Sequence, residues 1–318
     1  MDVAAPHHVA RSGVIRKTDR SEALSADALH RSLNAFNHTR FEPGLPSPEW
    51  KSACARENAS LHLEGVFVEA EREKVRERAL RAPREPDAFI RWFEELKASG
   101  PGQDDPLFAW LAESAPLMDM VWFLEQEVAG EAGFDDLVAL AQVKMPTRAK
   151  LELARSYWDE MGQGHASDMR GPMLARLSEA LGLAPDPNRV VWESLALGNL
   201  MAAFSANRRF AYHAIGALGV IELTAPDRAA RVNEGLKRLN VPGETRCYFA
   251  VHATLGVEHS EAWKHEVLRP LVAEKPAVST AIAEGALLRL EAGARCFARY
   301  RRKLWMTDGR TVTAFPAQ

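Results

Sequence analysis

The sequence predicts an all-α fold, a helical bundle in one compact domain. Alanine, leucine, glutamate, arginine and lysine, which are good helix formers, dominate the chain from about residue 48 onward. Apolar residues recur at spacings of three and four, as in Phe89, Trp92 and Leu96, which places them on one helical face. A β-run is suggested only near the end of the chain, so helices joined by short loops describe the pattern best.

Bulk composition excludes several classes of protein. The 318 residues are 47% hydrophobic, an ordinary share for a globular chain with a sizeable core. The net charge of -3 comes from interspersed charges, so neither a nucleic acid nor a membrane surface is expected as a partner. The cysteines Cys54, Cys247 and Cys296 are far apart and form no disulfide or zinc pattern. With no apolar leader or spanning segment recognised, we expect a cytoplasmic location.

Prolines and glycines divide the chain into helical segments. Breaks are predicted at residues 99–102, 144–146, 182–187, 225–226, 241–243 and 274–276. The predicted organisation has three parts: a mobile N-terminal arm with one short helix (1–45), a helical domain (46–305) and a C-terminal tail (306–318). An alternative is a small helical subdomain over residues 48–100 that packs on a main bundle.

The first segment that could carry chemistry holds two acids. Glu127 and Glu131 are four residues apart, so they share a helical face, and small or apolar residues surround them. Burying a lone carboxylate is costly, which favours a partner such as a metal. The alternative interpretation is a solvated acidic face.

The second segment combines acids with a backbone bend. Asp159 and Glu160 close a helical run, and Gly162 and Gly164 follow. Acidic and aromatic residues beside such a bend suggest a site. The alternative interpretation is a helix end with a glycine cap.

The third segment places one acid in an apolar run. Glu222 follows Gly216 and Gly219, which would let a neighbouring helix approach closely. Such an acid is expensive to bury unless it binds a metal or pairs with a base, for which Arg208 and Arg209 are candidates.

The fourth segment holds two histidines. His252 and His259 are seven residues apart, two helical turns, and project from one face. They are either metal ligands or satisfied core histidines. Together the four segments place carboxylates and histidines on separate helices, which is how bundle iron sites are built.

In their order and separation these segments resemble the heme-oxygenase-like diiron oxidases and oxygenases, a family of iron-containing redox enzymes. The resemblance covers about residues 105–302. It implies a heme-oxygenase-like helical bundle whose core helices supply the iron ligands. The metal ligands implied by the family pattern are Glu131 (with Glu127 as second choice), Glu160, Glu222, His252 and His259.

Two positions depart from the family pattern. Gly256 stands where the family has an aspartate between the two histidines, and Arg170 stands where it has a histidine. Glycine offers no ligand, and an arginine stays cationic and would pair with Glu160 in place of a metal. His165, in the same turn, is an alternate ligand. One or two Fe(II) ions are therefore expected.

The resemblance implies a dioxygen-dependent oxidase or oxygenase that acts on an amino-acid-, amine- or fatty-acid-like substrate. Dioxygen would be the co-substrate, and an external electron donor and a homodimer are expected. The expected pocket residues are Trp122, Tyr157, Trp158 and Phe249. The alternative is a metal-depleted, non-catalytic relative that binds a ligand or a partner protein.

Overall fold

The protein is built from helices, and the computed structural model describes residues 25–130, 133–184 and 186–307. Within these ranges there is no strand, in agreement with the predicted all-α fold. The α-helices are α1 (Ala26–Phe41), α2 (Trp50–Leu80), α3 (Pro86–Ser99), α4 (Pro106–Glu113), α5 (Leu117–Gly130), α6 (Phe134–Ala141), α7 (Thr147–Glu160), α8 (Arg170–Leu181), α9 (Trp192–Ala206), α10 (Ala211–Arg238), α11 (Cys247–Ala262), α12 (Arg269–Glu274) and α13 (Val278–Thr307). Shorter helical turns are η1 (Gly162–Gly164), η2 (Ala166–Asp168), η3 (Arg208–Phe210) and the π-helical η4 (Trp263–Leu268).

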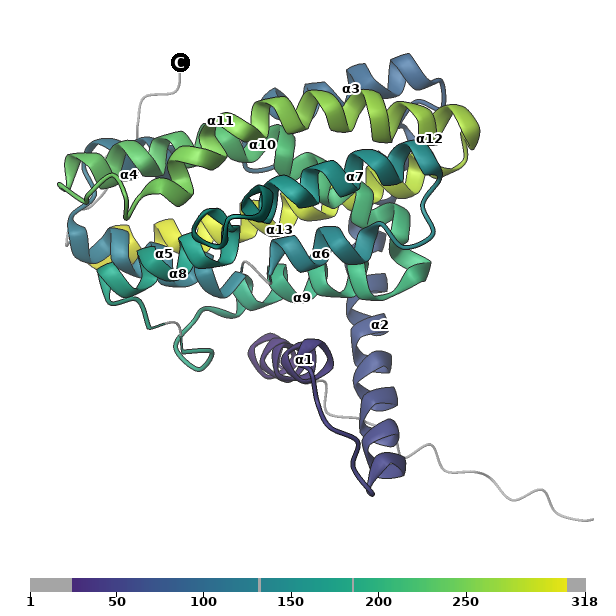
Figure 1. The fold of residues 1–318 in the computed structure, drawn as a ribbon, viewed down its shortest axis with the longest axis horizontal. Helices are drawn as coiled ribbons and strands as arrows, with labels where there is room; N and C mark the ends of the chain where they lie inside the picture. The colour runs from purple at the N-terminus through teal and green to yellow at the C-terminus, as the bar shows by residue number, and fades with distance from the viewer. Residues whose placement is uncertain (1–24, 131–132, 185, 308–318) are drawn as a thin grey trace, which may run out of the picture.

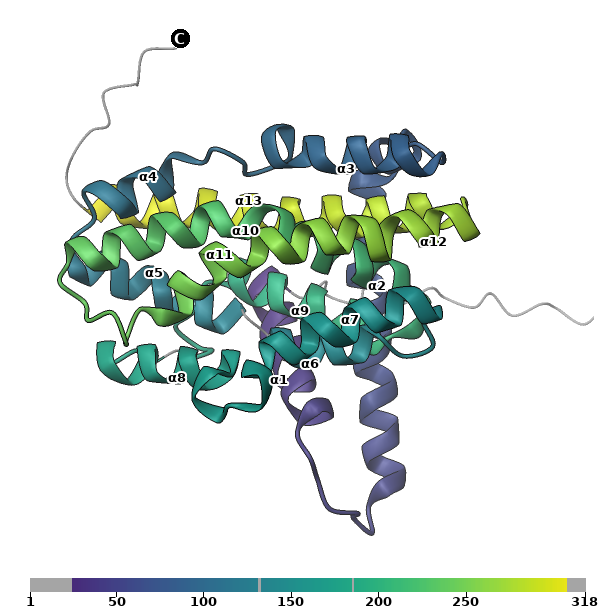
Figure 2. The same cartoon turned by 45° about the horizontal axis from the view of Figure 1, so that its top comes forward.

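Three long helices form the centre of the molecule (Figure 1). Helix α10 packs against both α11 and α13, and all three run lengthwise. Figure 2 shows α3 and α4 on one side of this core and α6 to α9 on the other. In both views the first half of α2 projects away from the bundle, whereas α1 packs against α9. No helix in the described ranges has the length and the hydropathy needed to cross a bilayer.

Glycines let α10 approach its neighbours closely. A methyl group on Gly216 would collide with the backbone of Ile282 on α13, and one on Gly219 would collide with the indole of Trp263. The same indole donates a hydrogen bond to the carbonyl of Ile215, at 3.3 Å. The sequence predicts a close helix approach at these two glycines, and the structure confirms it.

Helix ends follow the predicted breaks with one exception. Five of the six breaks fall between helices, but α10 continues through residues 225–226 to Arg238. Pro226 has no N–H to donate to the carbonyl of Glu222, so the helix loses one hydrogen bond there. The Pro226 ring is buried against Gly256 of α11. The predicted break is therefore wrong because a tertiary contact holds the proline inside the helix.

The predicted N-terminal arm contains a packed helix. Ser25 caps α1 by accepting a hydrogen bond from the Ala28 N–H at 3.2 Å, and Leu33 is buried. The Asn37 amide donates to Asn199 of α9 at 2.8 Å, which ties α1 to the bundle. Residues 1–24 of the arm and 308–318 of the tail lie outside the described residues, so the domain boundaries stay a prediction.

Alanine at Gly216 is expected to destabilise the protein by about 3 kcal/mol, because the added methyl would force α10 away from α13. The control is Gly171→Ala on α8, where nothing lies within 4 Å of an added Cβ. That change is expected to be neutral or slightly stabilising, since alanine is the better helix former. Urea unfolding curves of both variants make the comparison, and equal midpoints would contradict the close-packing account.

Candidate functional site

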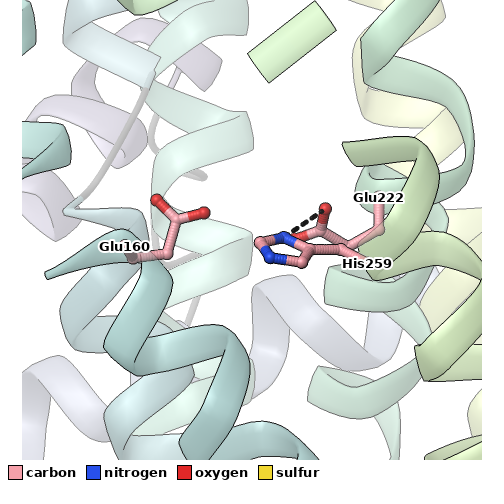
Figure 3. Close-up of side chains that lie close together, drawn as sticks. All are labelled: Glu160, Glu222 and His259. Atoms are coloured by element: carbon pink, nitrogen blue, oxygen red, sulfur yellow. Dashed lines mark ion pairs between the residues drawn. The ribbon is translucent and has the colours of Figure 1, made fainter. Parts of the chain in front are cut away.

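Two carboxylates and one histidine meet inside the bundle. Glu160 ends α7, Glu222 lies in α10 and His259 in α11, and their ligand atoms all lie within 4.8 Å of one another. All three side chains are buried. Figure 3 shows Glu222 and His259 next to each other and Glu160 on the opposite side. Three separate helices thus bring potential metal ligands to one point.

His259 lies between two carboxylates. Its Nδ1 is 3.6 Å from Glu222 Oε2, and its Nε2 is 3.1 Å from Asp159 Oδ2. Burial lowers the pKa of His259, but Glu222 and Asp159 outweigh burial and raise this pKa to about 9. The ring is therefore protonated at neutral pH. If it loses that proton from Nδ1, Nε2–H can still donate to Asp159, and Nδ1 becomes free to bind a metal.

Glu160 is paired with Arg170. The Arg170 Nη1 lies 3.3 Å from Glu160 Oε2, and its Nη2 donates to the Tyr248 hydroxyl at 2.9 Å. The guanidinium also stacks over the Phe134 ring, 4.4 Å from its centroid. Burial raises the pKa of Glu160, but Arg170 and then His252 outweigh it and hold this pKa at about 2. The structure thus contains the ion pair that the sequence predicts.

His252 is also next to Glu160. Its Nε2 lies 3.6 Å from Glu160 Oε2, and its Nδ1 lies 2.5 Å from the backbone carbonyl of Tyr248. A carbonyl only accepts, so Nδ1 carries the hydrogen of this bond. Nε2 is then the nitrogen that faces the carboxylate and that a metal would use. The Glu160, Glu222 and His259 cluster therefore has a second histidine at its edge.

The position between the two histidines has no room for a ligand. A Cβ added to Gly256 would lie 2.6 Å from Pro226 Cγ and 3.7 Å from the carbonyl oxygen of Glu222. An aspartate there would push α10 and α11 apart. Arg170 offers no ligand atom either, and the donor atoms that cluster in the described residues, those of Glu160, Glu222 and His259, could hold a metal ion.

A cavity of about 140 Å³ adjoins the cluster. Glu222, His252 and His259 line one part of it, and its walls are largely apolar and aromatic. Further lining residues include Phe108, Phe123, Glu127, Leu197, Arg228, Val232, Tyr248, Phe249, Leu255, Arg289, Cys296, Phe297 and Tyr300. Glu222 and His259 thus face a partly open cavity that could hold a small molecule.

Several candidate ligands lie away from the cluster or cannot be placed. Glu131 lies outside the described residues. Glu127 lines the cavity, where it accepts a hydrogen bond from the Tyr300 hydroxyl at 3.2 Å. His165 is exposed, with its Nδ1 3.2 Å from the carbonyl of Gly162. The structure therefore gives His165 no place among the clustered ligand atoms.

Glu222 does not pair with either of the arginines that the sequence suggests. Arg208 donates to the backbone carbonyls of Leu140, at the end of α6, and Val143, and Arg209 pairs with Glu69 at 3.7 Å. Within the described residues, the ion-pair partner of Glu222 is His259. This alternative for Glu222 is therefore wrong.

The predicted pocket residues are mostly elsewhere. Phe249 lines the cavity as predicted. Trp122 packs edge-on against the Tyr300 ring at 5.7 Å, Tyr157 packs against the main core, and Trp158 is exposed. Helix neighbours of a site residue project from other faces, so proximity in sequence was a poor guide here.

Sequence reasoning missed three residues of this region and the role of a fourth, Asp159. Asp159 orients His259, and Tyr248 binds Arg170. Arg228 and Arg289 line the cavity. A signal existed for one of them: Arg289 is followed by Cys296 and Tyr300 at spacings of seven and four, which puts three cavity residues on one face of α13.

Comparisons with known proteins support the helical-bundle fold. The family model of iron-containing redox enzymes matches residues 121–294, more than half of the chain. No curated protein matches. A crystal structure of a CADD-like protein of unknown function from Nostoc punctiforme is similar with a TM-score of 0.53 and 17% identity, over 69% of this chain and 98% of that one. A second crystal structure of that protein is similar with a TM-score of 0.50 and 17% identity, over 73% of this chain and 99% of that one. The predicted heme-oxygenase-like bundle is confirmed.

Without metal, the protein is expected to lose stability as the pH rises from 6.5 to 9. The folded-state pKa of His259 is raised, so its stabilising contribution is complete below pH 6.5 and disappears as the pH passes 9. The change should be about 3 kcal/mol. Urea unfolding in chelator across this range measures it. His259→Gln should flatten the dependence of stability on pH, whereas His265→Gln, at an exposed position, should not. A wild-type protein whose stability does not decline over this range would contradict the role of His259.

Aspartate at Gly256 is expected to destabilise the protein by about 2 kcal/mol because of the collision with Pro226. Adding Pro226→Ala should recover part of that loss, which a double-mutant cycle of unfolding free energies measures. Additive effects of the two substitutions would show that the packing of Gly256 on Pro226 is not what excludes a side chain.

Proposed function

The chain belongs to the iron-containing redox enzyme family, and on that premise we propose that it is a non-heme iron enzyme that uses dioxygen to oxidise a small substrate. The observation that carries the proposal is the convergence of Glu160, Glu222 and His259 beside a cavity. Carboxylate and imidazole ligands with open positions suit Fe(II) in oxygen-using sites. A ferrous ion there would supply the binding and reduction of dioxygen.

The residues of the chain would hold one ion. Glu160 and Glu222 would bind through carboxylate oxygens and His259 through Nδ1, with His252 available as a fourth ligand. Asp159 would keep accepting from His259 Nε2–H and so fix the ring. Because His259 must first lose a proton, the apparent affinity should fall about tenfold for each pH unit below 9.

The cavity would orient the substrate and exclude water. Its aromatic and aliphatic walls favour an apolar chain, and the cluster faces that space at one end. An amino-acid-, amine- or fatty-acid-like molecule suits such a cavity. A cytoplasmic homodimer that receives electrons from an external donor completes the proposal.

A second candidate function is ligand or partner binding without metal. The observation in its favour is that Arg170 and protonated His259 already neutralise the two acids. A buried carboxylate needs a counter-charge, and these two groups provide one without an ion. In that case the chain would keep the fold of its family but not the oxidation chemistry.

Anaerobic titration with Fe(II), followed by metal analysis, separates the two candidates. About one iron per chain is expected. Glu222→Ala and His259→Ala should both abolish tight binding, because each removes one of the three donors that cluster in the described residues. Glu258→Ala and His265→Ala are matched controls at exposed positions and should bind iron like the wild type.

Other outcomes would have clear meanings. Two irons per chain would contradict the account of Gly256 and Arg170. Absence of iron, with a melting temperature that does not change on adding Fe(II), would refute the iron enzyme and favour the metal-free relative.

A further inference from the structure

Arg228 is a charged side chain in the cavity that the iron cluster does not use. It lies on α10, six residues after Glu222. Its guanidinium donates to the Thr224 hydroxyl at 3.2 Å and lies 5.9 and 5.6 Å from the ring centroids of Phe108 and Phe297. Among the described residues, it forms no ion pair with a carboxylate.

These surroundings favour an anion next to Arg228. Burial and the neighbouring Arg289 lower the pKa of Arg228 to about 10, while Glu127, in the same cavity, and Asp227 act in the opposite direction. The side chain nevertheless stays charged at neutral pH. Neither carboxylate forms an ion pair with Arg228, and its hydrogen bond to Thr224 uses one of its five N–H donors. A bound anion would provide the counter-charge and accept from the remaining donors.

We propose that Arg228 binds the carboxylate of a small substrate, whose other end then lies against Glu222 and His259. A guanidinium matches a carboxylate with two parallel hydrogen bonds, which fixes orientation as well as affinity. The Arg289 side chain lines the same cavity and adds positive charge to this wall. The orientation of the substrate rests on the proposed iron function, whereas the anion subsite itself does not.

The dimensions limit the ligand to amino-acid size. Six residues of helix separate the backbones of Glu222 and Arg228 by about 9 Å. The cavity of about 140 Å³ is close in volume to an apolar cavity of roughly 150 Å³ that takes up benzene, so only a small molecule can fit. A carboxylate with the chain length of norleucine fits these limits, and a long-chain fatty acid does not.

Calorimetric titration with hexanoate, L-norleucine and hexylamine tests the subsite, because these probes share one alkyl chain length and differ in the head group. The full-length protein is used, both iron-loaded and metal-free. We expect the two carboxylates to bind and Arg228→Gln to weaken them roughly tenfold to hundredfold. Hexylamine should bind more weakly than hexanoate and be insensitive to the substitution. Arg231→Gln, an exposed change on the same helix, should leave all affinities unchanged.

Thermal melting and iron content are measured on every variant. If Arg228→Gln does not fold, Arg228→Lys replaces it, since lysine keeps the charge but loses the two-pronged geometry and should bind hexanoate several-fold more weakly. Equal carboxylate affinity in wild type and variant, or no carboxylate binding in either metal state, would overturn the subsite. So would an affinity for hexanoate that depends on iron but not on Arg228.

The iron readout keeps the two proposals apart. Arg228→Gln should hold as much iron as the wild type, because Arg228 is not among the clustered ligands. A chain that binds no iron yet binds hexanoate through Arg228 supports the subsite and refutes the iron function. A chain that binds iron but shows no Arg228-dependent carboxylate binding supports the iron function and refutes the subsite.

Discussion

The burial of two carboxylates in an apolar bundle is the constraint on which the rest of the site depends. Glu160 and Glu222 each need a positive charge nearby, since an unpaired buried carboxylate is strongly destabilising. Arg170 meets that need for Glu160, and protonated His259 meets it for Glu222. A metal ion would meet the same need. Protonation and metal binding therefore compete at His259, whose pKa of about 9 reflects how strongly the surrounding acids favour a positive charge there.

The two departures from the family pattern have different physical consequences. Arg170 removes a ligand but keeps a positive charge beside Glu160, so the electrostatic environment of the acid is preserved. Gly256 removes the side chain altogether, and α11 packs against Pro226 in the space that a side chain would need. A bound cation could take over the positive charge that Arg170 supplies. A side chain at position 256, by contrast, would fit only if α10 and α11 moved apart. Packing thus leaves no room for a side chain at position 256, while Glu160, Glu222 and His259 still converge in the described part of the chain.

The sequence predicted those features that depend on local chemistry. Helix ends such as those of α3 and α12 follow from nearby glycine or proline, and the close approach at Gly216 follows from the missing side chain. Pro226 within α10 could not be predicted, because its burial against Gly256 is a contact between helices. The role of Asp159 was missed for the same reason, since its partner His259 lies 100 residues away. Spacing predicted which side chains could be ligands but not which groups orient them or line the cavity.

Charge at the two ends of the cavity would decide how a carboxylate substrate lies. Without a metal, protonated His259 balances the charge of Glu222, so Arg228 marks the end of the cavity that would attract an anion. With a metal, both ends attract the anion, and Arg228 must compete with the ion. Its advantage is the two-pronged hydrogen bond, made between the Phe108 and Phe297 rings where water is scarce. A carboxylate held about 9 Å along the helix leaves the open positions of the metal to dioxygen. In the proposed enzyme, a separate anion subsite would thus keep the substrate from occupying the positions that dioxygen needs.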